Sequence, residues 1–489
     1  MNADTRRFVV EVLTPVHVGS GVLLPSTEVP YDKSDDRSYV LDLDAALDAL
    51  GPESFRSDRI PDPEGLLSEL RNRGVPLDAV CWESVGGRFA ARDLRLCVRD
   101  GCGRPLLPGS STKGALRTAL LVGLGWDHCA DRRSGRGDAA VAEVLGRLPD
   151  GPKFAARRLE KALLRPDRAR DGRDQLDPHD DPLRVLSVTD AAFDARCAVV
   201  EYARVSSPAG KKLDSLKDYK IGVEALAAGS KAECSLRLDG FLGREHAERL
   251  GFDAAGISWQ SLAGRSRDQA RRLVRLDLAH YQAIGLDEPA RALEDLVSTI
   301  DGAPEGSIVL RIGWGIGWAG TTGALASPDE RHRLIRKYGP KLSRHSLDAY
   351  PADRPFPKSR KVVGREAPQG VFGWVVLRPA GDGERVPPPE PPPVYRAPRS
   401  ELSITPRDDS ARTPARSPGD LIVQELTTFK PHELAGRVRD FYDRVLRSCT
   451  DQDDRRKALT AIRDRMKDAG LLKKWKDKPW IVELMKALS

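Results

Sequence analysis

The sequence lacks any apolar run long enough to cross a bilayer. A membrane-spanning helix needs about 18 or more consecutive apolar residues, and the 489-residue chain contains no such stretch. The N-terminal sequence Met1–Arg7 is polar and charged, and the apolar core of a secretory signal does not follow it. We therefore expect a soluble, cytoplasmic protein with no membrane partner.

Cysteine is scarce and irregularly spaced. The chain has 7 cysteines, an odd number, and no two have the Cys-x-x-Cys spacing of common zinc and redox motifs. This pattern indicates reduced thiols rather than a disulfide framework. The group Cys97, Cys102, His128 and Cys129 could supply zinc ligands, but its spacings fit no common zinc module. We predict that these cysteines are structural and that there is no metal site.

The sequence also lacks a loop for nucleotide hydrolysis. No G-x-x-x-x-G-K-[ST] pattern is present, which argues against an ATPase. No metal cluster and no clear pair of nucleophile and base stand out. We therefore predict a binding protein that needs no cofactor.

What the chain does have is length and an uneven positive charge. Its 489 residues predict two or three domains, and the net charge is +7. Residues Leu421–Ser489 contain 16 Lys and Arg against 11 Asp and Glu, so this short end carries most of the excess. A basic end favours a polyanion such as nucleic acid, although a solvated helical surface explains it equally well.

The order of elements predicts an α+β protein with a separate C-terminal part. Apolar, β-branched strand candidates alternate with helical segments, at Arg6–Leu13, Arg184–Asp190, Ser307–Ile312 and Val371–Leu377. Hairpins between them favour α+β modules over a doubly wound parallel sheet. Residues 379–418 hold 11 of the 36 prolines, which is typical of a semi-rigid linker. Helical periodicity follows from Leu421 to the end.

The first motif is the sequence PGSSTKGALR, residues Pro108–Arg117. Ser110 or Ser111 is a suitable N-cap for a following helix. The start of a helix presents unpaired N–H groups that suit a phosphate, and Lys113 and Arg117 lie one turn apart, so both could reach the same anion. An ordinary capped helix is the simpler explanation of the motif alone.

A glycine-rich segment follows the strand near residue 312. Gly313–Gly323 contains five glycines, and two tryptophans are interleaved with them. Glycine lets a backbone approach a ligand closely, and tryptophan can stack on an unpaired base. The predicted contacts are Gly313, Trp314, Gly315, Gly317 and Trp318. The alternative is a turn with two core tryptophans.

Two further segments carry candidate side chains. The sequence Thr14–Gly21 contains His17, which could act as a general base in RNA cleavage, followed by the turn residues Gly19, Ser20 and Gly21. We favour a structural role for this histidine. The basic sequence Phe356–Lys361 suits phosphate contacts, or is a plain solvated loop.

These motifs, in this order, resemble the RAMP superfamily of CRISPR-associated proteins. The sequences LTPVHVGSG, LPGSSTKGALRTAL, SVTD, RIGWGIGWAGTTG, FPKSRKVV and GWVVL carry the resemblance, which spans Arg6–Leu377. Within the superfamily the chain looks most like the fifth subunit of the type III-A Csm effector complex. Nothing after Pro379 is covered by the resemblance.

The resemblance implies two RRM-like ferredoxin-fold RAMP modules, at residues 1–183 and 184–378. A Pro-rich linker, 379–420, and a small all-helical basic domain, 421–489, would follow. It further implies a non-catalytic subunit that caps the backbone filament and contacts the 3′ part of the CRISPR guide RNA. Its partners would be the backbone RAMP subunit, the small helical subunit and host nucleases that trim the guide. The implied RNA contacts are His17, Gly19, Ser20, Gly21, Ser110, Ser111, Lys113, Arg117, Gly313, Trp314, Gly315, Gly317, Trp318, Lys358, Arg360 and Lys361.

Three alternatives stay open. The chain could be a metal-independent RAMP endoribonuclease that processes CRISPR repeat RNA through His17. It could be a backbone or 5′-end subunit of a type III-A or III-B complex, in which a loop aspartate cleaves target RNA; Asp32, Asp35 and Asp36 are the candidates. In the tail, Trp475 and Trp480 lie among basic residues and suit RNA stacking or a protein interface. The basic residues around these two tryptophans are Lys473, Lys474, Lys476 and Lys478.

Overall fold

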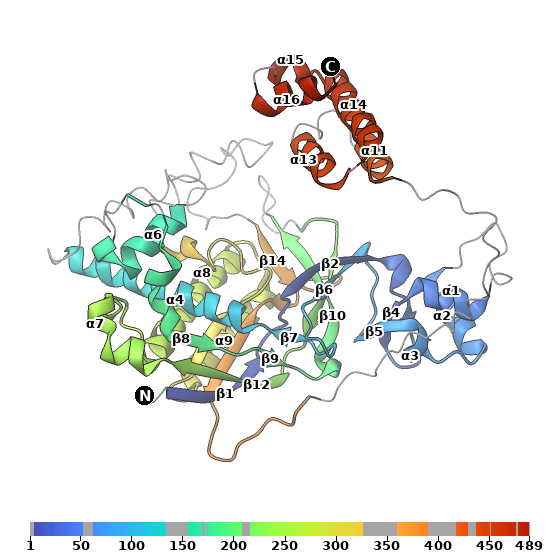
Figure 1. Ribbon diagram of the computed structural model, residues 1–489. Helices are drawn as coiled ribbons and strands as arrows, with labels where there is room; N and C mark the ends of the chain where they lie inside the picture. Colours follow the sequence, from blue (N-terminus) through green and yellow to red (C-terminus); the bar gives the residue numbers. More distant parts are fainter. Residues whose placement is uncertain are drawn as a thin grey trace. The chain divides into compact units, whose positions relative to one another are not determined.

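The computed structural model (Figure 1) shows two compact units, Met1–Arg399 and Ser400–Ser489, which we describe separately. Among the residues described, no helix has the length and apolar character needed to span a membrane. The structure describes residues 4–51, 62–133, 155–168, 172–173, 175–207, 216–325, 359–389, 417–428, 437–449, 451–475 and 478–488.

The first unit contains a five-stranded antiparallel sheet in the order β13-β16-β1-β12-β8. Its strands are β1 (Asp4–Val12), β8 (Leu186–Val188), β12 (Lys231–Leu238), β13 (Ile308–Arg311) and β16 (Trp374–Pro379). Side chains alternate between two faces of a strand, and both faces of this sheet are apolar. In β13, Ile308 and Leu310 join one core cluster while Val309 joins another.

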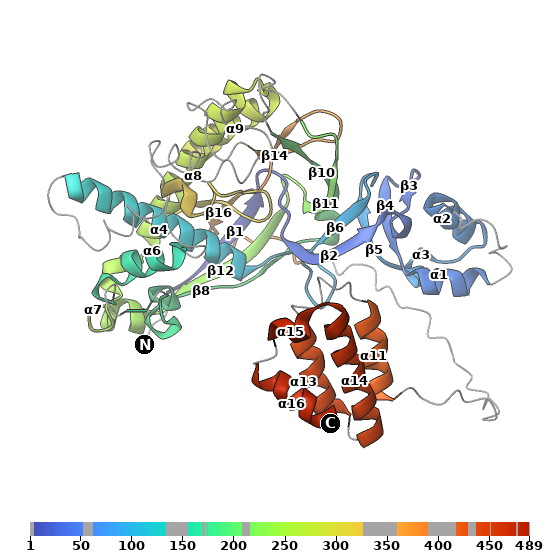
Figure 2. The ribbon, with the colours of Figure 1, turned by 90° about the horizontal axis from the view of Figure 1, so that it is seen from above.

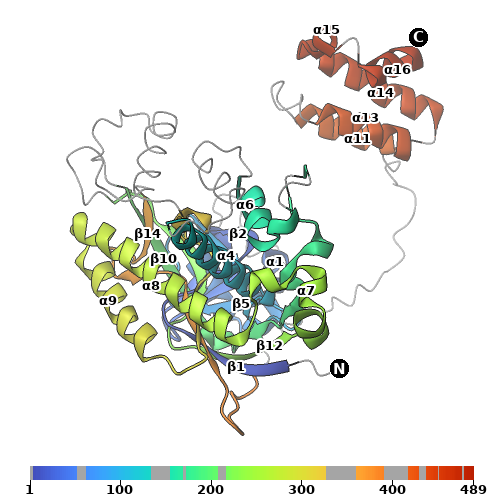
Figure 3. The ribbon, with the colours of Figure 1, turned by 90° about the vertical axis from the view of Figure 1, so that its left-hand side faces the viewer.

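Helices cover this sheet. The long helices are α4 (Gly109–Arg133), α8 (Trp259–Ala283) and α9 (Asp287–Gly302), and the shorter α6 (Ala155–Leu164) and α7 (Ala247–Leu250) lie beside them. Helix α8 packs against α4, α9 and β13, and Figures 2 and 3 show α4 and α8 side by side. Helix α8 begins with a capping box in which Ser258 and Ser261 bond each other's backbone N–H groups.

A second sheet of nine strands lies in the same unit. Its path is β2-β6-β11-β10-β5-β4-β3, and β14 pairs with β10 and with β15. Helices α1 (Leu43–Leu50), α2 (Pro63–Asn72) and α3 (Leu77–Val80) pack against β4 and β5 through an apolar cluster of their own. The strands are β2 (Gly19–Pro25), β3 (Tyr31–Asp32), β4 (Arg37–Leu41), β5 (Cys81–Gly86), β6 (Asp93–Cys97), β10 (Ala198–Ser206), β11 (Ile221–Leu226), β14 (Arg360–Val363) and β15 (Gly370–Val371). A separate pair joins β7 (Leu106–Leu107) to β9 (Ala191–Ala192).

The mixed α+β class predicted from the sequence is confirmed. Both sheets, however, combine strands from before and after residue 184. Strand β1 pairs with β12 on one side and β16 on the other, so the proposed boundary between residues 1–183 and 184–378 does not separate two sheets. The sequence alone does not show this pairing, because the partners of β1 lie more than 200 residues away along the chain. Two RRM-like modules remain a prediction.

A buried carboxylate joins the two sheets. Asp277 of α8 is 1% exposed and binds Arg360 at the start of β14, with the carboxylate oxygen 2.8 Å from Nε. It also binds Arg311 at the end of β13. Burial would raise the pKa of Asp277, but the two guanidinium charges outweigh that effect and lower it to about 2. One charge therefore fixes a helix and the ends of strands from both sheets.

The second unit is helical in its described part. Helices α11 (Pro418–Thr428), α13 (Val438–Ser448), α14 (Gln452–Asp468), α15 (Leu471–Trp475) and α16 (Pro479–Leu488) surround an apolar core of their own. Leu426, Val445, Ile462 and Leu484 are fully buried in it. Most of the Pro-rich segment, residues 390–416, lies outside the described residues.

We predict that Asp277→Asn destabilises the first unit by about 3–5 kcal/mol, because two buried guanidinium groups lose their counter-charge. Since the folded pKa is depressed, the charge stabilises the fold above the ordinary carboxyl pKa of about 3.9. That stabilisation is lost as the pH falls toward 2. Urea unfolding at neutral pH and between about pH 4 and pH 2 measures both effects.

The matched control is Asp268→Asn on the same helix, whose side chain is 60% exposed. We expect it to change the unfolding free energy by less than about 1 kcal/mol. Equal stability of the Asp277 and Asp268 variants would contradict the role assigned to the buried charge.

Candidate nucleic-acid interface

The structure brings the His17 segment and the glycine-rich segment together. The backbone N–H of Trp314 donates to the carbonyl oxygen of His17 at 2.7 Å. Gly313 has a φ of 84°, and a Cβ there would lie 2.5 Å from the same oxygen. Only glycine fits this position, so two motifs almost 300 residues apart form one site.

Trp314 is the centre of this site. The His17 ring meets it edge-on with 6.0 Å between centroids, and Phe372 does so at 6.2 Å. Lys361 of β14 places Nζ 4.5 Å from the indole centroid, and Arg95 of β6 places Cζ at 5.7 Å. The ring expected to stack on a base instead contacts two cations of its own chain. We infer that Trp314 positions these cations.

Arg95 and Lys361 form a pair of like charges. Burial, and then the charge of Arg95, lower the pKa of Lys361. In the part of the chain that the structure describes, neither side chain forms an ion pair with a carboxylate. Two neighbouring cations repel each other unless an anion lies between or beside them, so this arrangement suits a phosphate group.

The backbone beside Lys361 is also shaped for an anion. Gly313, Gly315 and Gly317 have φ angles of 84°, 99° and 68°, whereas Trp314 and Ile316 between them have negative φ. Alternating φ signs are typical of the anion-binding nests that successive N–H groups form. The Trp314 N–H itself is used by the His17 carbonyl oxygen. A pocket lies here, lined by Val205, Gly315, Ile316, Gly317, Trp318, Ala319, Ser359, Arg360 and Lys361.

His17 has a structural position. It is 2% exposed, and its Nδ1 lies 2.6 Å from the carbonyl oxygen of Glu224, so Nδ1 carries the proton. Burial lowers the pKa of His17, although the bond to Glu224 partly opposes this, and the ring is neutral at neutral pH. A Cβ at Gly19 would lie 3.0 Å from Nε2. Ser20 and Gly21 lie at the exposed start of β2, where the Ser20 hydroxyl donates to the Leu96 carbonyl at 3.1 Å.

The same Glu224 fixes the strand that carries Arg95. Its carboxylate accepts the backbone N–H of Cys97 at 2.8 Å and pairs with Arg99, which also binds Glu83 at 2.6 Å. Burial, then the Glu224 charge, raise the pKa of Glu83 to about 7 despite the arginine. This buried group ties β11 to the end of β6.

The PGSSTKGALR motif serves the fold in this structure. Helix α4 begins at Gly109, and its first N–H donates to Asp190 at 2.7 Å. A Cβ on Gly109 would collide with the Val188 carbonyl oxygen. The predicted caps Ser110 and Ser111 lie within the first turn instead. An aspartate from the SVTD segment therefore accepts the first N–H of the helix, and the predicted RNA contacts of Ser110 and Ser111 remain a prediction.

Lys113 and Arg117 also have partners within the chain. Lys113 donates to the Leu186 carbonyl at 2.7 Å, and Arg117 binds Asp181 at 2.7 Å and Glu160 at 3.2 Å. Burial lowers the pKa of Lys113. These contacts give both cations a role within the fold, and their predicted contact with RNA remains a prediction.

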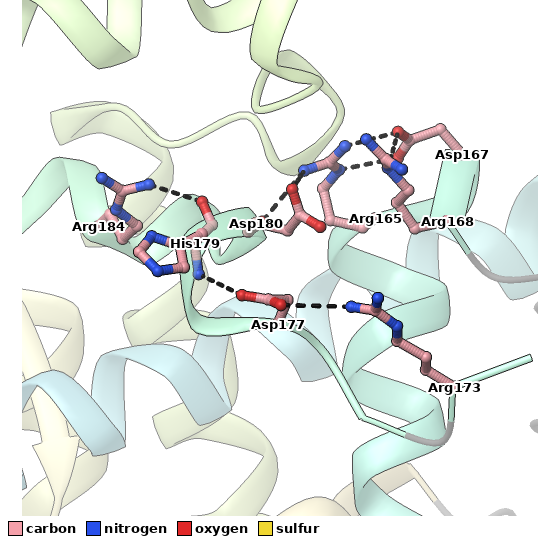
Figure 4. A network of polar contacts seen from close by, with 8 residues as sticks. All are labelled: Arg165, Asp167, Arg168, Arg173, Asp177, His179, Asp180 and Arg184. Carbon is pink, nitrogen blue, oxygen red and sulfur yellow. Dashed lines mark hydrogen bonds and ion pairs between the residues drawn. The ribbon is translucent and has the colours of Figure 1, made fainter. Parts of the chain in front are cut away.

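Polar contacts also connect residues between Arg165 and Arg184 (Figure 4). Arg165, whose side chain is 4% exposed, binds Asp167 at 2.6 Å and Asp180 at 3.2 Å. Asp177 pairs with Arg173 at 3.3 Å and accepts the backbone N–H of His179. Arg117, Arg165 and Arg173 thus pair with carboxylates, whereas Arg95 and Lys361 beside Trp314 form no such pair among the described residues.

The other residues predicted to contact RNA are Trp318, Lys358 and Arg360. Trp318 and Arg360 both line the pocket, and the Arg360 guanidinium binds the buried Asp277. Their contacts with RNA remain a prediction. Lys358 lies outside the described residues. Arg95 was not among the predicted residues, although charged and apolar residues alternate from Arg92 to Arg99, a pattern typical of a half-exposed strand.

The candidate metal group does not assemble in the described chain. No cluster of three or more His, Cys, Asp or Glu side chains arranged for a metal occurs among the described residues. Cys97 is buried, whereas Cys102 and Cys129 are exposed, and all three are free thiols.

Comparison with known proteins supports the fold. A chain of the cryo-EM structure of a Csm–crRNA–target RNA ternary complex from a type III-A CRISPR-Cas system superposes with a TM-score of 0.56 and 20% identity, covering 77% of this chain and 100% of that one. The crystal structure of Csm5 from T. onnurineus gives a TM-score of 0.52 and 18% identity, over 76% and 100%. A search of curated proteins found no match.

A family model describes the relationship more directly. The model of the RAMP superfamily matches residues 9–319, which is more than half of the sequence and includes the His17 and Trp314 segments. The chain belongs to the RAMP superfamily.

Proposed function

We propose that this protein is an RNA-binding structural subunit of a type III-A Csm effector complex. We further propose that the RNA backbone is held around Trp314, by Arg95, Lys361 and the adjoining pocket that Lys361 lines. The observation that carries the proposal is the pair Arg95 and Lys361, two cations held over one indole ring without a carboxylate partner among the described residues. The likeness to Csm subunits supports the fold on which this pocket is built.

The ligand of this pocket is the CRISPR guide RNA. A guide carries a variable spacer sequence, so a protein that holds it must rely on phosphate and shape rather than on base identity. Backbone N–H groups from Gly315–Gly317 and two cations would provide such contacts without a base-specific pattern. By the resemblance, the subunit caps the filament near the guide 3′ end and supports guide maturation. Its partners there are backbone RAMP subunits, the small helical subunit and host nucleases.

The geometry favours this role over cleavage through His17. That ring is buried, and its Nδ1 binds a backbone carbonyl. The alternative role as a backbone subunit would need a catalytic aspartate in the β3–β4 hairpin. There, Asp32 binds Arg71 and Ser34, and Asp36 accepts a hydrogen bond from the Tyr31 hydroxyl at 2.8 Å. Asp36 has a φ of 55° at the turn itself. These contacts give the aspartates a structural use.

We predict that Arg95→Ala combined with Lys361→Ala weakens binding of guide RNA by about tenfold or more. Loss of two phosphate contacts reduces the slope of log affinity against log salt by about 1.4, since each contact on a single strand contributes about 0.7. Fluorescence anisotropy over a salt series measures both quantities.

The matched control removes one arginine and one lysine elsewhere in the same unit. Arg92 is 94% exposed and Lys231 is 50% exposed, and we expect Arg92→Ala with Lys231→Ala to leave the slope nearly unchanged. If both double variants lose the same affinity, the pocket around Trp314 is not the RNA site.

We predict that neither the wild-type protein nor His17→Ala cuts CRISPR repeat RNA in the presence of EDTA. The substitution should instead lower the unfolding free energy by about 1–3 kcal/mol, because the Glu224 carbonyl loses its buried donor. Gel analysis of the RNA and urea unfolding provide the two readouts. Site-specific cutting that disappears in the variant would establish the endoribonuclease alternative.

A further inference from the structure

The C-terminal unit carries its whole net charge in one segment. Residues 463–478 contain seven Lys and Arg against three Asp and Glu. The other residues from 417 to 489 contain nine of each sign and are balanced. The charge is therefore a local feature of the end of α14, of α15 and of the turn that enters α16.

Ion pairs hold three cations of the helices outside this segment: Arg439–Asp443, Arg444–Glu425 and Lys457–Asp420. Within the segment, Arg463 pairs with Asp464. In contrast, Lys467 and Lys478 are exposed and have no carboxylate partner among the described residues. The helix dipole favours cations in the last turn of α14, but it does not account for those that follow the end of the helix.

An aromatic cluster lies under these cations. Trp475, which is partly exposed, stands 6.4 Å from Trp480, and Trp480 stands 5.3 Å from Tyr442 between ring centroids. Lys478 places Nζ 3.8 Å from the Trp475 centroid. Helices α15 and α16 both contact α14, so the aromatic rings lie on helices that pack against the one carrying Lys467. The side chains of Lys473 and Lys474, and Lys476 entirely, lie outside the described residues.

From this combination we propose that the segment 463–478 is a second binding surface for single-stranded RNA. The cations supply phosphate contacts and Trp475 supplies an aromatic face, the two elements that sequence-independent single-strand binding combines. The proposal does not depend on the pocket around Trp314, because the helical unit has its own core and its own charge. The strand bound is either guide RNA or target RNA, which share this chemistry.

The test uses the full chain with Arg95→Ala and Lys361→Ala, so that the first unit contributes little. The probe is a labelled oligouridylate of about 20 nucleotides, longer than the roughly 4–16 nucleotides that one binding module covers. Three neutralising changes within the segment are added: Lys467→Gln, Lys474→Gln and Lys478→Gln. We expect affinity to fall about tenfold and the salt slope to fall by about 2, at about 0.7 per lost contact.

A matched control removes the same charge from the other parts of the unit. Its changes are Arg447→Gln, Arg455→Gln and Arg456→Gln. Arg456 and Lys467 are eleven residues apart on α14, roughly 16 Å along its axis at 1.5 Å per residue. We expect the control to retain most of the affinity. Circular dichroism of both variants checks that the helices remain folded.

Two further experiments distinguish RNA from an acidic protein, and guide RNA from target RNA. Equal loss in the test and control variants, or binding of polyglutamate but not of oligouridylate, would overturn the proposal, and the second result would point to an acidic protein. In the complex reconstituted with guide, crosslinks from the tail to the guide without target RNA identify the guide as the ligand. Crosslinks that form only on the added strand identify the target RNA.

Discussion

The buried ion pair of Asp277 with two arginines is the constraint from which the site follows. The carboxylate lies in α8, and its partners Arg311 and Arg360 come from strands of different sheets. Burying a charge is costly unless it is paired, and here one negative charge is shared by two positive ones. Any rearrangement of either strand end would leave a guanidinium group uncompensated inside the core.

The chain next to each of the two arginines contributes to the pocket. The glycine-rich segment begins two residues after Arg311, and Lys361 directly follows Arg360. Fixing both arginines on one carboxylate therefore brings the glycine-rich segment and Lys361 together in the lining of one pocket. Trp314 then holds Lys361 and Arg95 on its ring. The charges of Asp277, Arg311 and Arg360 stabilise the fold. The charge of Lys361, the residue after Arg360, remains available for an anion.

Much of this could be predicted from the sequence, and the failures have a common cause. The mixed α+β class, the glycine-rich segment and the structural role favoured for His17 follow from local patterns. Local patterns cannot show that Arg360 turns inward while Lys361 turns outward, since both belong to the same basic run. They also cannot show that Asp190, 81 residues away, caps α4 at Gly109. Strand β1 pairs across the boundary predicted near residue 184 for the same reason, because pairing partners are remote in sequence.

The most direct test of the account is photo-crosslinking of 4-thiouridine-labelled guide RNA in the reconstituted complex, with the attached residues identified by mass spectrometry. The account predicts that crosslinks in the first unit fall within Trp314–Ala319 and around Lys361. Crosslinks concentrated at the start of α4, on Lys113 and Arg117, with none near Trp314, would contradict it. That result would mean that the ion pairs of those two cations open when RNA binds.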